Sequence, residues 1–109
     1  MTAPLVLPMH RDHADRVVRL VAAEGLCTST GLECLRQLGL NADENALDAA
    51  VYHLLIVQHL RAGDRDARTA VDALPTVPYP EVLAGAIAEH EAHYRDAVDV
   101  LAVRQAVAS

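Results

Sequence analysis

The residues in this sequence best suited to chemistry are its six histidines. An imidazole changes charge near neutral pH and also binds transition metals. His10 and His13 are three residues apart, and His90 and His93 repeat that spacing. Residues three apart share one face of a helix. If the two pairs lie on different helices that meet, they can bind Zn, Ni, Cu or iron, or haem. They can also form a cluster that protonates near pH 6 and loosens the packing.

The more common role of such histidines is structural. A histidine on an amphipathic helix is usually half-buried at the edge of the apolar face, or is bonded to a backbone carbonyl within the core. We therefore expect no cofactor and keep a transition-metal or haem site as the alternative.

The sequence contains no common catalytic motif. It has no phosphate-binding glycine loop, no GxGxxG, no GxSxG and no HExxH. The segment His90-Glu91-Ala92-His93 resembles the last of these only in composition, because its histidines are three residues apart rather than four. Cys27 and Cys34 match no CxxC spacing and are interpreted as a reduced, structural pair. We expect a protein that is not an enzyme.

A helix-turn-helix regulator is a second alternative. The segment 33–41 has the apolar spacing and the turn glycine of a first helix with its turn. The helix that follows begins with Asp43, Glu44, Asn45 and Asp48, and the carboxylates of its three acidic residues would face phosphates. Nucleic-acid binding is therefore not expected.

The segment Pro75–Pro78 matches the PxxP motif, but a rigid elbow between helices explains it better.

The composition predicts a helical protein. Of the 109 residues, 52% are hydrophobic and 22% are charged, which is ordinary globular usage and one domain's length. Phe and Trp are absent and Ala and Leu are abundant, which favours helices over sheets.

The net charge of −6 opposes attraction to nucleic acid and anionic membranes. The apolar runs are too short for a membrane span, and the first residues lack the features of a signal peptide, so we expect a cytoplasmic protein.

Glycines and capping residues divide the chain into helices. We expect an extended arm over residues 1–9 and one compact all-α domain of four to five helices over 10–109. The expected helices cover about 10–24, 31–38, 42–62, 65–74 and 80–106. Gly25, Gly39 and Gly63 are expected to end the first three. The pairs Thr30 with Glu33 and Asn41 with Glu44 are expected to form capping boxes, and Asp64 is expected to cap the fourth helix.

Two of these helices organise the fold. The helix at about 42–62 is apolar on nearly every side, which predicts a buried central helix. The helix at about 80–106 is long, and its apolar residues follow alternating steps of four and three, the spacing of a seam between helices. That seam comprises Leu83, Ile87, His90, Tyr94, Ala97 and Leu101.

These patterns predict a small regulatory or assembly protein that acts through protein–protein interaction. The expected partners are a second copy of the chain, in a homodimer, and a further protein of unknown identity. The residues expected to dock are Leu83, Ile87, Tyr94 and Leu101, with Arg95 and Arg104 at the rim.

Overall fold

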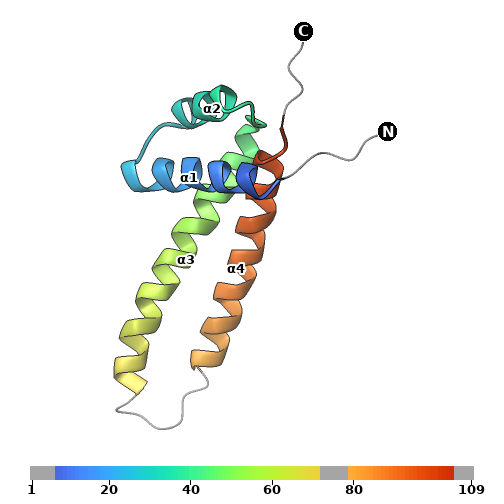
Figure 1. The fold of residues 1–109 in the computed structure, drawn as a ribbon. Helices are drawn as coiled ribbons and strands as arrows, with labels where there is room; N and C mark the ends of the chain where they lie inside the picture. The colour runs from blue at the N-terminus through green and yellow to red at the C-terminus, as the bar shows by residue number, and fades with distance from the viewer. Residues whose placement is uncertain (1–6, 72–78, 105–109) are drawn as a thin grey trace.

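The computed structural model describes residues 7–71 and 79–104, and within them the chain is all-α (Figure 1). Its four helices are α1 (Pro8–Glu24), α2 (Thr28–Gln37), α3 (Glu44–Val71) and α4 (Tyr79–Leu101). The predicted fold class, a single helical domain, is confirmed. None of the described helices combines the length and hydropathy that a bilayer crossing requires.

Helix α1 starts at Pro8, two residues before its predicted start, with proline in the first turn where its missing N–H is tolerated. The predicted arm is therefore shorter, and residues 1–6 lie outside the described residues. Gly25 ends the helix in the left-handed conformation at φ 61°, as predicted.

Helix α2 starts three residues earlier than predicted. Cys27 is its N-cap, and the Cys27 carbonyl accepts hydrogen bonds from the N–H groups of Thr30 and Gly31. Thr30 therefore lies inside the first turn, and the predicted capping box of Thr30 with Glu33 is wrong. The turn after α2 contains Gly39 at φ 72°, which ends the helix as predicted.

Helix α3 is capped by Asp43 rather than by Asn41. The Asp43 carboxylate accepts a hydrogen bond from the N–H of Ala46 at 2.9 Å. Asn41 instead donates its side-chain amide to the carbonyl of Val100, at 3.1 Å, and its backbone N–H to Leu101. The predicted capping box of Asn41 with Glu44 is wrong because the Asn41 side chain joins the α2–α3 loop to the end of α4.

Helix α3 continues through Gly63 to Val71, so the predicted end at Gly63 and the separate helix at 65–74 are wrong. Gly63 does not take a positive φ. A glycine inside a helix costs about 1 kcal/mol relative to alanine, which a 28-residue helix tolerates.

Residues 72–78, including Pro75 and Pro78, lie outside the described residues. Helix α4 ends at Leu101, several residues before its predicted end near 106.

Helices α3 and α4 form an antiparallel hairpin, and α1 and α2 pack at the end where α3 begins and α4 ends (Figure 1). The largest fully buried side chains are at this end: Val18, Leu35, Leu40, Leu47 and Leu101. Helix α3 contacts all three other helices, as predicted for the central helix. The narrow polar strip predicted for this helix is exposed: Asn45, Asp48, Tyr52, Leu55 and His59.

The hairpin makes the molecule long. At 1.5 Å per residue, the 28 residues of α3 extend over about 42 Å. The radius of gyration is 17.1 Å, compared with about 13 Å for a compact domain of 100 residues. The half of the hairpin that extends beyond α1 and α2 is a single layer of two helices (Figure 1).

Candidate functional site

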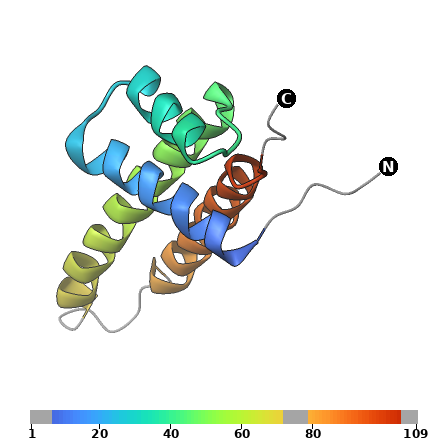
Figure 2. The same ribbon diagram turned by 45° about the horizontal axis from the view of Figure 1, so that its top comes forward.

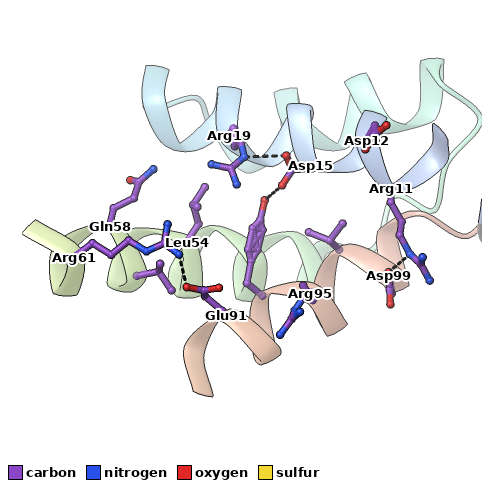
Figure 3. A pocket seen from close by; sticks show the side chains of 13 residues that line it. Arg11, Asp12, Asp15, Arg19, Leu54, Gln58, Arg61, Glu91, Arg95 and Asp99 are labelled. Atoms are coloured by element: carbon purple, nitrogen blue, oxygen red, sulfur yellow. Dashed lines mark hydrogen bonds and ion pairs between the residues drawn. The ribbon is translucent and has the colours of Figure 1, made fainter. Parts of the chain in front are cut away.

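The two faces of the hairpin differ in charge. Helix α1 lies across one face (Figure 2), and side chains of α1, α3 and α4 line a cavity of about 550 Å³ there. The apolar floor of this charged groove consists of Leu54, Val57 and Val98. Its polar lining is Arg11, Asp12, Asp15, Arg19, Gln58, Arg61, Glu91, Tyr94, Arg95 and Asp99 (Figure 3).

Most of the charged side chains in this groove form ion pairs with one another. Arg11 Nε donates to Asp99 at 2.6 Å, and this pair connects α1 with α4. Arg61 donates to Glu91, which connects α3 with α4. These side chains are well exposed, so each pair contributes about 0–1 kcal/mol to stability. Their main effect is to set the position of one helix against another.

Tyr94 is the best-buried polar group of the groove, with 7% of its surface exposed. Its hydroxyl donates to Asp15, which also accepts a 2.8 Å bond from Arg19 Nε. The Arg19 guanidinium lies 5.8 Å from the centre of the Tyr94 ring, within the range of a cation–π contact. Burial, and then the bond to Asp15, raises the pKa of Tyr94 above its ordinary range. The hydroxyl therefore stays protonated and holds α1 against α4.

The lining of the groove carries no net charge, since it contains four arginines and four carboxylates. Three of those arginines already bind carboxylates of the groove, which leaves no excess charge to select a ligand. We conclude that the groove mainly fixes the position of α1.

The face turned away from α1 has a different character. The helical spacing places eight residues there, which we call the histidine face: Ala49, His53, Ile56 and Leu60 on α3, and Val82, Ala86, His90 and His93 on α4. None of them is an acid or an arginine. Six of the eight are half-buried, while Val82 and His93 are exposed. In the chain as described, no other helix covers this face (Figure 2).

Three imidazoles meet at the centre of the histidine face. His53 Nδ1 lies 3.0 Å from His90 Nδ1, and the two ring centres are 5.2 Å apart. The ring of His93 stacks on His53, with centres 5.0 Å apart. Partial burial, and then repulsion from His93 and His90, lowers the pKa of His53 below its usual value. The His53 ring therefore resists becoming positively charged.

The structure does not bring the four predicted metal ligands together. His90 and His93 contact His53, whereas His10 and His13 lie on α1, on the opposite face of the hairpin. His10 is buried, and its Nδ1 has no hydrogen-bond partner among the described residues. Within residues 7–71 and 79–104, no group of three or more His, Cys, Asp or Glu side chains is arranged to hold a metal ion.

The predicted docking residues are mostly unavailable to a partner. Leu83, Tyr94 and Leu101 are buried within the chain, and Ile87 is half-buried. Their spacing does mark a helix–helix seam, but α4 packs along it against α3 of its own chain. The predicted rim residues are exposed: Arg95 beside the charged groove and Arg104 beyond the end of α4.

Sequence reasoning missed His53 as a member of the cluster. The spacing of three that marked His90 and His93 is local, whereas the partner of His90 lies 37 residues away in the chain. The pairing of α3 with α4 was needed to find it.

Comparison with known proteins finds no matching family model, no matching curated protein and no matching solved structure. The function is therefore argued from the geometry of the hairpin.

Proposed function

We propose that this chain is a small, non-catalytic regulatory or assembly protein that works by self-association, and that its interface is the histidine face. One observation carries the proposal: the hairpin has a charged face that α1 covers and an uncharged, half-buried face that no described helix covers.

The layering of the fold supports a helical partner. A helix with an apolar side is stable when a second layer covers that side. Helix α1 supplies this layer on the charged face only. A second hairpin laid on the histidine face completes a four-helix bundle, which is a common arrangement for paired helical hairpins.

The charge distribution favours a second copy of the chain as that partner. Two chains of net charge −6 repel each other over most of their surfaces. The histidine face contains no carboxylate, so the repulsion is smallest there. A two-fold interface joins the same patch on both copies, and an uncharged patch is complementary to itself.

A matched pair of substitutions tests the proposal. Ala86→Glu puts a carboxylate on the histidine face, and Ala92→Glu puts one on an exposed position of the same helix outside that face. By sedimentation equilibrium at pH 7.5, we expect the parent chain and Ala92→Glu to be dimers and Ala86→Glu to be a monomer. Thermal melts by circular dichroism check that both variants fold. A monomeric parent chain at tens of micromolar contradicts the proposal.

A further inference from the structure

The two Nδ1 atoms that face each other in the contact between His53 and His90 can share only one proton. Two Nδ1 atoms 3.0 Å apart form a hydrogen bond when one carries a proton and the other offers a lone pair. When both rings are charged, two N–H groups point at each other and the contact is repulsive. The cluster in its present geometry is therefore the neutral or singly protonated form.

The surroundings offer little compensation for added positive charge. On α3, the nearest aromatic neighbour is the uncharged phenol of Tyr52, whose ring centre lies 5.1 Å from that of His53. On α4, Glu89 approaches His93 Nε2 at 4.0 Å but is largely exposed, and the exposed Asp96 follows His93 by one turn. The charged groups of α1 that meet the hairpin line the opposite face. No described carboxylate contacts His53 or His90.

We propose that protons control the self-association: the neutral cluster of His53, His90 and His93 keeps the interface uncharged, and protonation of the cluster on acidification separates the two copies. This regulation rests on the proposed function, because it acts on the same face.

The direction follows from linkage between protonation and docking. Docking removes water from the imidazoles, which disfavours their charged form in the dimer. Separated copies then bind more protons than the dimer does, so acidification through the histidine range favours separation. If each copy takes up one proton on release, the dimer dissociation constant rises about 100-fold per pH unit across that range.

The test is sedimentation equilibrium of the full chain at pH 7.5, 6.5 and 5.5 in a buffer of constant ionic strength. His53→Gln and His90→Gln keep a polar side chain that does not titrate. His59→Gln is the matched control, because His59 is exposed on α3 and does not belong to the cluster. We expect the parent chain and His59→Gln to dissociate on acidification, and each cluster variant, which has one titratable ring fewer on the face, to show a clearly smaller rise of the dissociation constant between pH 7.5 and pH 5.5.

The outcomes separate the two proposals. A parent chain that is monomeric at every pH overturns the self-association and with it the proton control. A dimer whose dissociation constant does not change with pH, or cluster variants that respond like the parent chain, overturns only the proton control. Dissociation accompanied by loss of the helical circular dichroism signal shows acid unfolding instead. Dissociation by EDTA at pH 7.5 shows that a metal ion, not the absence of protons, holds the copies together.

Discussion

At the scale of single residues, Tyr94 shows how one hydroxyl connects helices that are distant in sequence. Tyr94→Phe removes the donor to Asp15 but keeps the ring and its contact with Arg19. We expect a loss of about 1–2 kcal/mol in the free energy of unfolding, measured by urea denaturation, because Asp15 loses one partner in a half-buried site. The control is Tyr52→Phe, since Tyr52 is exposed and should change stability little. Equal effects of the two substitutions would contradict the assigned role of Tyr94.

Cys27 provides a prediction about reactivity. Hydrogen bonds from Ser29, and then from the hydroxyl and the backbone of Thr30, lower the pKa of this exposed thiol to about 7. Because the thiolate is the reacting form, alkylation of Cys27 by iodoacetamide should reach half its maximum rate near pH 7. Cys34 is half-buried and should react more slowly.

The two single-cysteine variants, Cys34→Ser and Cys27→Ser, isolate each thiol for this measurement. Adding Ser29→Ala to the first variant should move its rate profile toward higher pH, since it removes the largest cause of the lowered pKa. A Cys27 profile that coincides with that of a free thiol would exclude the hydrogen-bonded arrangement.

The sequence identifies some residues of the candidate site and not others, for a physical reason. The spacing of His90 and His93 is visible along one helix, so their shared face can be predicted. The same spacing pairs His10 with His13 on α1, but it says nothing about which helices meet, and the structure does not bring this pair to His90 and His93. Three of the predicted docking residues, Leu83, Tyr94 and Leu101, are buried within the chain, because an apolar seam has the same spacing whether it faces a helix of its own chain or a second copy.

At the scale of helices, Gly31 and Gly63 form a natural comparison. A Cβ atom added to Gly31 would lie 2.8 Å from Val21 Cγ2 and 2.9 Å from Leu47 Cδ2, so α2 packs against α1 and α3 through this glycine. We expect Gly31→Ala to destabilise the fold by about 1–3 kcal/mol because of overpacking. Gly63 is helical and has open space around it, so Gly63→Ala should stabilise α3 by about 0.5–1 kcal/mol.

Differential scanning calorimetry of the two glycine variants measures both changes against the parent chain. Opposite shifts in Tm are expected. A higher Tm for Gly31→Ala would mean that α2 moves away from α3 at little cost.

Helix ends were predictable where the backbone conformation decides them. Gly25 and Gly39 end α1 and α2 because each takes a positive φ that other residues avoid. Gly63 has the same residue type but lies inside a helix that continues to Val71. The capping box of Asn41 with Glu44 does not form because the Asn41 side chain instead bonds to the carbonyl of Val100, a partner that only the folded chain provides.

At the scale of the whole molecule, the length of the hairpin has a measurable consequence. Ala86→Glu, expected to be monomeric, should give a radius of gyration near 17.1 Å by small-angle X-ray scattering. A value near 13 Å, that of a compact 100-residue domain, would mean that the hairpin folds back on itself. The parent dimer should give a clearly larger value than the variant.

The contacts of α1 also bear on the order of folding. Helices α3 and α4 are neighbours in the chain, whereas Asp15 and Tyr94 are 79 residues apart and Arg11 and Asp99 are 88 apart. Contacts between distant residues require closure of a long loop and tend to form late. The hairpin should therefore form in the transition state and α1 should dock afterwards. Substitutions on α1 such as Asp15→Asn should accelerate unfolding in stopped-flow experiments while leaving the refolding rate nearly unchanged.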